Sequence, residues 1–142
     1  MLERDLQTKV ADYLRLQYPR ILFHSDYGSG VKLTVRQATI QKRQNGGRRG
    51  WPDMFIAEPE PRCIDGSWNY EWHGLFIELK KERTRLKKKD GNWASDHITE
   101  QAGMLSRLRE RGYVAEFAVG FDEAKKIIDE YLGGPQQEKV EF

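Results

Sequence analysis

The apolar positions near the start of the chain recur at helical intervals. Leu6, Val10 and Leu14 follow this spacing until Pro19, which cannot continue a helix because its ring removes a backbone donor and clashes with the preceding turn. We therefore predict an amphipathic helix over residues 2–18, with its charged residues facing outward.

The rest of the chain alternates short apolar runs with helical or turn-rich stretches. Apolar runs bounded by glycine, proline or polar turns predict strands at residues 21–24, 54–56, 74–80 and 113–119. Helical spacing predicts helices at residues 98–111 and 122–132, and a basic helix or irregular segment at residues 34–44. Glycines predict turns at residues 27–30 and 45–47, and prolines with an Asp-Gly pair predict a surface hairpin or loop at residues 58–73.

This order of elements predicts an α/β fold, in which helices flank a small mixed β-sheet. The 142 residues suffice for one domain, which we assign to residues 1–133, with a polar C-terminal tail at residues 134–142. No apolar run approaches the roughly 18–20 residues of a membrane span. Because the start lacks an apolar leader and the single Cys63 cannot form an internal disulfide, we expect a cytoplasmic protein with no membrane partner.

The basic residues are concentrated in two stretches, although the net charge is only +2. Residues 31–50 hold six basic side chains and no acid, and residues 80–89 hold seven with one acid. Such local positive potential suits a surface that binds a polyanion, while two solvated basic loops would give the same pattern. The candidate phosphate contacts are Lys32, Arg36, Lys42, Arg43, Arg48, Arg49, Lys87, Lys88 and Lys89.

The predicted strand at residues 74–80 carries the candidate chemistry. Because strand side chains alternate, Glu78 and Lys80 share one face of a strand that is otherwise apolar. Asp53, at the mouth of the preceding strand, comes close to Glu78 if the two strands pair. Two converging carboxylates favour a hard cation such as Mg²⁺, to which the backbone carbonyl of Leu79 adds an oxygen ligand. Lys80 would then orient or deprotonate a water that attacks a phosphodiester.

These residues resemble the motif of the PD-(D/E)XK nuclease superfamily, which stands here as Pro52-Asp53 followed by Glu78-Leu79-Lys80. With Arg48-Arg49-Gly50-Trp51 before the motif and Thr99-Glu100-Gln101 after it, the chain resembles the VRR-NUC family, the virus-type replication-repair nucleases, over residues 3–120. The resemblance implies a restriction-endonuclease-like core and Mg²⁺, with Mn²⁺ as a substitute. It further implies structure-selective cutting of branched or flapped DNA in a bacterial or virus-infected cell. Stand-alone members of this size resemble Holliday-junction resolvases that act as homodimers.

The same resemblance draws two further polar residues into the site, because family members use a helix glutamine and an N-terminal helix glutamate. Gln101 matches the glutamine, and helical spacing turns it inward, where a buried amide needs partners. It would position Lys80 or the water, or it would merely hydrogen-bond the end of a strand. Glu3 matches the glutamate at the end of the apolar stripe. It would hold the metal or its water shell, or it would simply favour the helix dipole as a first-turn acid.

Two alternatives to this function remain open at the level of the sequence. A nuclease of the same superfamily that cuts or nicks ordinary duplex would carry the same motif. A non-catalytic DNA-binding module with a nuclease fold would keep the architecture, although the complete set of acidic and lysine positions favours an enzyme.

Other conspicuous side chains carry weaker expectations. The three histidines do not combine with Cys63 in a zinc-binding spacing, and we expect His24 in the core or in a groove. We also expect Trp51 in the core. Trp68 and Trp72, with Tyr70, would form a hairpin surface that contacts a partner. Glu116 interrupts an apolar strand, and the sequence indicates no role for it.

Overall fold

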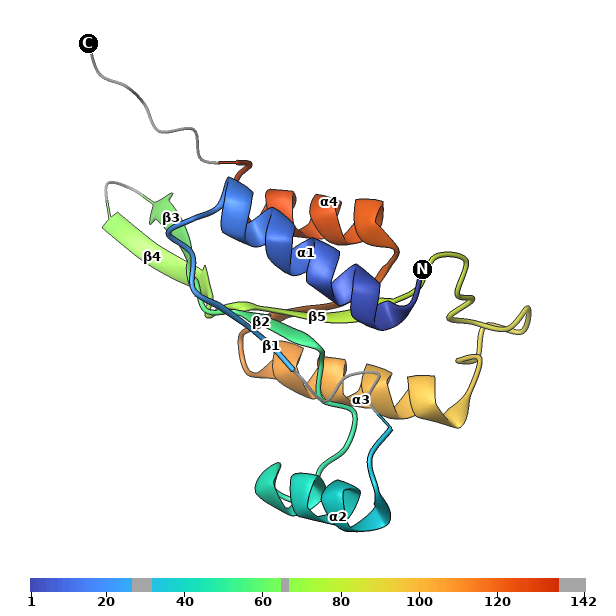
Figure 1. Cartoon of the computed structure of the whole chain (residues 1–142). Helices are drawn as coiled ribbons and strands as arrows, with labels where there is room; N and C mark the ends of the chain where they lie inside the picture. Colours follow the sequence, from blue (N-terminus) through green and yellow to red (C-terminus); the bar gives the residue numbers. More distant parts are fainter. Residues whose placement is uncertain (27–31, 65–66, 136–142) are drawn as a thin grey trace.

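A four-stranded sheet with helices on both faces forms the centre of the molecule (Figure 1). The computed structural model describes residues 1–26, 32–64 and 67–135. The sheet has the order β1 (Phe23–Ser25), β2 (Met54–Ile56), β5 (Leu75–Lys80) and β6 (Val114–Val119). A separate two-stranded ribbon consists of β3 (Glu60–Ile64) and β4 (Ser67–Trp72). The helices are α1 (Glu3–Gln17), α2 (Val35–Gln44), α3 (Asp96–Glu110) and α4 (Phe121–Leu132).

The register of the sheet determines which polar residues meet. β1, β2 and β5 are antiparallel, whereas β5 and β6 run parallel and are joined through α3, as a parallel pair requires a crossover. Met54, the first residue of β2, pairs with Ile77. Continuing this register by one position puts Asp53 opposite Glu78, as the predicted strand pairing requires.

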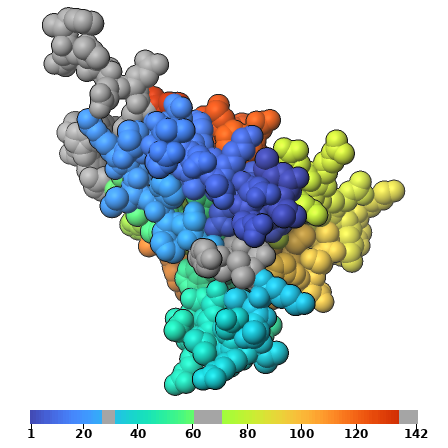
Figure 2. Space-filling model, in the orientation of Figure 1, coloured from blue at the N-terminus to red at the C-terminus, as the bar shows by residue number. Residues whose placement is uncertain are grey.

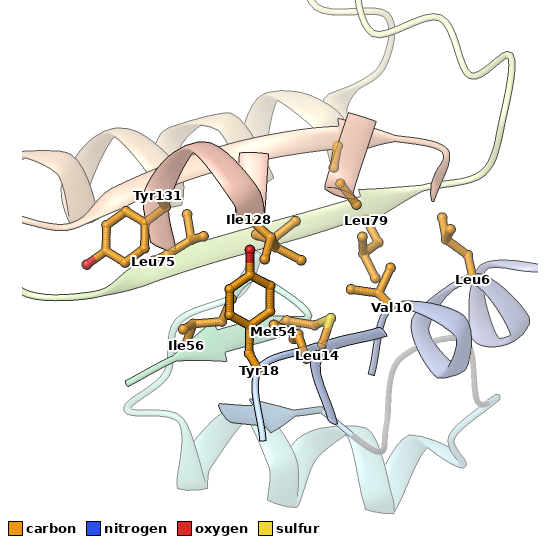
Figure 3. Close-up of a cluster of buried hydrophobic side chains, with 13 residues drawn as sticks. Leu6, Val10, Leu14, Tyr18, Met54, Ile56, Leu75, Leu79, Ile128 and Tyr131 are labelled. Carbon is orange, nitrogen blue, oxygen red and sulfur yellow. The ribbon is translucent and has the colours of Figure 1, made fainter. Parts of the chain in front are cut away.

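One hydrophobic core lies between the sheet and the α1–α4 layer (Figure 3). Leu6, Val10 and Leu14 recur at helical intervals, so α1 turns one apolar stripe toward the sheet. Full burial of one such side chain contributes roughly 1.5–3 kcal/mol. The other buried members of this core are Tyr18, Met54, Ile56, Leu75, Ile77, Leu79, Ala118, Ala124, Ile128 and Tyr131.

A second core lies between the opposite face of the sheet and α3. Ser95 caps this helix by accepting a hydrogen bond from the backbone N–H of Ile98, which satisfies one of the unpaired donors of the first turn. The buried residues of this core are Ile98, Ala102, Met104, Leu105, Leu108, Ala115 and Phe117. α3 is therefore fixed against β6, and its N-terminal half carries Gln101.

α2 differs from the other helices because it has no buried residue. Figure 2 shows it as a projection from the body of the molecule, and Val35 is 86% exposed. Its N-terminus is held by a capping box, in which Thr34 and Gln37 each accept a hydrogen bond from the backbone N–H of the other. Local capping, and not burial, therefore stabilises this helix.

The predicted fold class and the order of elements are confirmed. The structure places β1 and α3 about two residues from the predicted bounds, and it forms a hairpin within residues 58–73. Two core placements are wrong: His24 is exposed on the edge strand β1, and Trp51 is 40% exposed, with its ring packed against Phe76.

Several predictions fall on residues that the structure does not describe. The glycine turn at residues 27–30, most of the tail from residue 136 and the side chains of Trp68 and Tyr70 lie outside the described residues. Trp72, the remaining aromatic of that hairpin, packs against the core beneath α1 and α4. Within residues 1–26, 32–64 and 67–135, no helix has the length and apolar character that crossing a membrane requires.

Candidate active site

The buried polar side chains gather at one end of the central strand. Among the described residues, the buried polar or charged residues are Glu78, Lys80 and Gln101, which are 3%, 6% and 6% exposed. β5 supplies the first two and α3 supplies the third. Charged groups are rarely buried unless a partner or a ligand compensates them, so this cluster indicates a site and not a packing solution.

Glu78 is the centre of the cluster. Its Oε1 accepts a hydrogen bond of 2.8 Å from Nε2 of Gln101 and lies 3.9 Å from Nζ of Lys80. The partner of Gln101 is thus the Glu78 side chain, neither Lys80 nor the end of a strand. Within the described part of the chain, Oε2 of Glu78 and Oε1 of Gln101 are buried without a hydrogen-bond partner. Two buried acceptors without partners at one place destabilise the fold unless a donor or a cation binds to them.

Asp53 is fixed next to this cluster by the backbone. Its Oδ2 accepts a hydrogen bond of 2.7 Å from the N–H of Leu79, one position before β2 begins. The N–H and C=O of one strand residue point to the same edge, so the carbonyl of Leu79 also faces this edge. Asp53, Glu78 and Leu79 therefore present oxygens to a common region.

The charges at this site oppose one another. Burial raises the pKa of Glu78 well above its ordinary range, and the negative charge of Asp53 raises it further, while the ammonium of Lys80 acts in the other direction. A smaller contribution from the charge of Glu3 also raises this pKa, which means that the N-terminus of α1 lies close enough to act on the site. A cation bound between the carboxylates would reverse this balance and favour the ionised form of Glu78.

Glu3 itself is half-buried in the first turn of α1. Its influence on Glu78 fits the predicted role near the metal, and its place in the first turn also favours the helix dipole, so the two interpretations are compatible. One helical turn after Glu3, Nε2 of Gln7 donates a hydrogen bond of 2.9 Å to the backbone carbonyl of Asp26. The backbone N–H of Asp26 in turn donates a hydrogen bond of 2.8 Å to the carbonyl of Asp53. Gln7 cannot be recognised from the sequence, because no feature of residue type marks a side chain that donates a hydrogen bond to a distant backbone carbonyl.

The donor set fits magnesium better than zinc. In the described residues no group of three or more His, Cys, Asp and Glu side chains could hold a metal ion. Mg²⁺ is commonly held by only one or two carboxylates, with water and substrate oxygens completing the shell. Asp53 and Glu78 supply the carboxylates. A cation bound by them would also satisfy Oε2 of Glu78, which is buried without a hydrogen-bond partner among the described residues. The residues present therefore fit Mg²⁺.

All nine candidate phosphate contacts are exposed side chains. Six of them lie on or beside α2, and Lys87, Lys88 and Lys89 lie in the loop that follows β5, where Lys87 also stacks over the ring of Trp93. Gly50 joins the basic segment around α2 to the strand that carries the site. Its φ is +81°, and an added Cβ would lie 3.0 Å from the carbonyl oxygen of Glu100. Only glycine allows so close an approach, so Arg48 and Arg49 are held directly beside α3 and Gln101.

No family model and no curated protein matches this sequence. A solved structure named "VRR_NUC domain protein" aligns with 100% of this chain and 98% of its own, with a TM-score of 0.62 and 20% sequence identity. This chain has the VRR-NUC fold. The resemblance inferred from the motif residues is thus confirmed at the level of the fold, and the VRR-NUC fold accounts for the whole chain. Glu116, which had no assigned role, forms a surface ion pair of 3.8 Å with Arg109.

Proposed function

We propose that this chain is a Mg²⁺-dependent DNA endonuclease that hydrolyses phosphodiester bonds. The observation that carries the proposal is the buried Oε2 of Glu78, which has no hydrogen-bond partner in the described part of the chain and lies beside the carboxylate of Asp53 in a sheet of the VRR-NUC fold. An apolar core has no need for such a group, and it is costly to maintain without a ligand. The solved protein of the same fold carries the word NUC in its name, which supports a nuclease.

In this proposal Asp53 and Glu78 hold the ion, together with the carbonyl of Leu79. The ion, when bound, supplies Lewis-acid polarisation of a phosphate oxygen and makes water a better nucleophile. Mn²⁺ prefers the same hard oxygen ligands, so we expect it to substitute for Mg²⁺.

The remaining side chains orient the metal ligands and the attacking water, or accept a proton. Gln101 fixes Oε1 of Glu78, which leaves Oε2 directed at the ligand. Lys80, buried 3.9 Å from the same Oε1, orients the attacking water or accepts its proton. Glu3 acts from the start of α1 through an outer contact with the ion or its water. The nine exposed basic residues contact phosphates without selecting a base sequence.

The substrate in this proposal is branched or flapped DNA, including four-way junctions, and the active form is a homodimer because paired cuts need two sites. The structure offers exposed basic segments on two sides of the site, the α2 region and the loop after β5 (Figure 1). Two separated positive segments suit a substrate whose arms leave in different directions. A duplex-cutting or nicking enzyme and a non-catalytic DNA-binding module remain the alternatives to be tested.

The decisive experiment compares the wild type with Lys80→Met and Asp53→Asn on labelled four-way junction, flap, nicked and plain duplex DNA. Each substrate is incubated with Mg²⁺, Mn²⁺ or EDTA. Lys80→Met removes the ammonium group and keeps most of the length of the buried side chain, and Lys126→Met on the exposed surface of α4 serves as the matched control. Cutting by the wild type and the control with either metal, and by neither site variant, would support the proposal.

Other results would point to the alternatives. Equal cutting of plain duplex and branched DNA would indicate the duplex enzyme. Tight binding to the panel without cutting under any condition would indicate the binding module. Unchanged cutting by folded Asp53→Asn would show that the proposed carboxylate pair is wrong.

A further inference from the structure

A cleft of about 660 Å³ separates α2 from the segment that leads into the candidate active site. Lys42 lines it from α2, and Arg48, Arg49 and Trp51 line it from the other side. Pockets for small ligands and cofactors span roughly 300–1,000 Å³, so the cleft has room for an aromatic base with its sugar.

The cleft is positively charged. Lys42, Arg48 and Arg49 are exposed, and no described carboxylate forms an ion pair with any of them. Of the described residues that line it, Asp26 is the one acid. Three unpaired cations around a concave surface attract an anionic chain such as a phosphate backbone.

Trp51 adds a flat aromatic surface to this positive cleft. One part of its ring packs on Phe76, with the ring centroids 6.4 Å apart, and the residue is 40% exposed. Trp51 also borders a second hollow. Arg107 and Arg111, at the C-terminal end of α3, line this hollow. An exposed indole among cations is the arrangement with which proteins hold unpaired nucleotides, because any base can stack on it while the cations follow the backbone.

The lining of the cleft is linked through the backbone to the candidate active site. Trp51 precedes Asp53 by two residues, and the N–H of Asp26, which lines the cleft, bonds the carbonyl of Asp53 at 2.8 Å. A base within a duplex is already stacked and must be unpaired before it can reach a protein ring. A strand that enters the cleft next to the site is therefore a single strand.

We propose that this cleft binds an unpaired stretch of nucleic acid, with one base stacked on Trp51 and neighbouring phosphates on Lys42, Arg48 and Arg49. The inference rests on the proposed nuclease function and adds the feature that selects its substrate, a single-stranded arm beside the bond to be cut. DNA and RNA share this chemistry, so both are tested.

The first test measures binding in EDTA, so that no strand is cut. Fluorescence anisotropy is recorded for labelled oligo-dT, oligo-rU, a splayed DNA duplex and a blunt DNA duplex. Trp51→Ala is expected to weaken binding of the single strands and the splayed duplex by roughly tenfold or more, and of the blunt duplex less than twofold. Trp51→Phe retains most of the binding. A Trp51→Ala effect on oligo-dT or oligo-rU that exceeds the effect on the blunt duplex supports the proposal. An equal effect on all four substrates, or no effect on either single strand, overturns it.

A second comparison separates the cleft from general electrostatics. Lys42 and Arg43 are adjacent exposed cations of α2, but only Lys42 lines the cleft. Lys42→Gln is expected to weaken single-strand binding several-fold more than Arg43→Gln, and equal effects would contradict the proposal. If Trp51→Ala has a lower melting temperature than the wild type, Trp51→Leu replaces it in the test. This variant keeps apolar bulk against Phe76 without an aromatic face, and it should lose the same binding.

Cleavage with Mg²⁺ is assayed separately on the same substrates. Trp51-dependent binding of single strands without any cleavage would support the cleft and refute the nuclease. Cleavage that persists while single-strand binding is independent of Trp51 would refute the cleft and leave the nuclease in place.

Discussion

Gln101 on α3 and Glu78 on β5 are joined by a buried hydrogen bond of 2.8 Å across 23 positions of the chain. The bond connects the helical layer to the central strand at the point where the sheet presents its carboxylates. It also satisfies only half of each partner, because Oε2 of Glu78 and Oε1 of Gln101 have no partner among the described residues. The pair is therefore suited to orient a ligand as well as to hold the fold together.

Loss of this hydrogen bond should reduce activity more than stability. In Gln101→Met, which keeps the side-chain volume, Glu78 loses its donor and rotates more freely. Groups that orient a metal ligand typically affect metal affinity or activity by about 10–100-fold, and we expect a fall of that size in the cleavage rate. The rate is measured at several Mg²⁺ concentrations, with Gln17→Met at the exposed C-terminal end of α1 as the control. An unchanged rate in a folded Gln101→Met protein would exclude an orienting role.

Neutralising Glu78 should stabilise the metal-free protein. Burial raises the pKa of this carboxyl, so its ionised form is disfavoured in the fold, and Glu78→Gln removes that cost while preserving shape. We expect the melting temperature in EDTA to rise by a few degrees, which corresponds to about 1 kcal/mol, while cleavage is lost. Scanning calorimetry measures the shift, and Glu116→Gln, a surface partner of Arg109, should change it little. A lower melting temperature for Glu78→Gln would contradict this account.

Asp129 should make the free energy of unfolding depend on acid pH. Burial acts to raise the pKa of Asp129, but hydrogen bonds from Tyr13 (2.5 Å) and Tyr18 (2.7 Å), with the charge of Lys125, outweigh burial and lower it. Because the folded pKa lies below the unfolded value, this contribution is present above the unfolded pKa and disappears as pH falls through the folded pKa.

The variant Asp129→Asn tests this dependence. We expect it to lower the free energy of unfolding by about 2 kcal/mol at neutral pH, as for hydrogen bonds to a charged group, and by much less in strong acid. Urea unfolding at a series of pH values measures the difference. Asp12→Asn removes an exposed carboxylate from the same layer of the molecule and should have little effect at any pH. A loss that is independent of pH would mean that the charge of Asp129 is unimportant.

Arg48 and Arg49 should contribute to the salt dependence of DNA binding. Each phosphate contact that a cation makes releases counterions, so replacing both residues by glutamine should lower the slope of log K against log salt by roughly one per lost contact. The weakening should be similar for unrelated sequences. Arg15→Gln, which removes one exposed cation from α1, is the control. An unchanged slope would place the arginine pair away from DNA.

Much of the fold could be predicted because its signals are local. Apolar spacing in α1 and α3, the stop at Pro19 and the alternation in β5 each depend on a few neighbouring residues. The meeting of Asp53 with Glu78 could also be predicted, because two short strands joined through a hairpin have few ways to pair. For these features the chain's local preferences and its global fold agree.

The features that could not be predicted depend on contacts between distant segments. Trp51 has the apolar character of a core residue, yet it stays 40% exposed because its neighbours, Phe76 and the C-terminal half of α3, come from distant parts of the chain and cover only part of it. Gln7 acts through a backbone carbonyl 19 positions away, which leaves no mark in the residue types. The hydrogen-bond partner of Gln101 likewise depends on how α3 packs over β5. Helical spacing predicts only that the Gln101 side chain faces inward.

The self-capped α2, which buries no residue, has a consequence for how this protein can change. A helix that neither core requires can vary in sequence, length or charge without a loss of packing. The segment around α2 is therefore an exchangeable module, and grafting a different helix between residues 33 and 47 would retarget the protein to other nucleic acids while the buried carboxylates remained as they are.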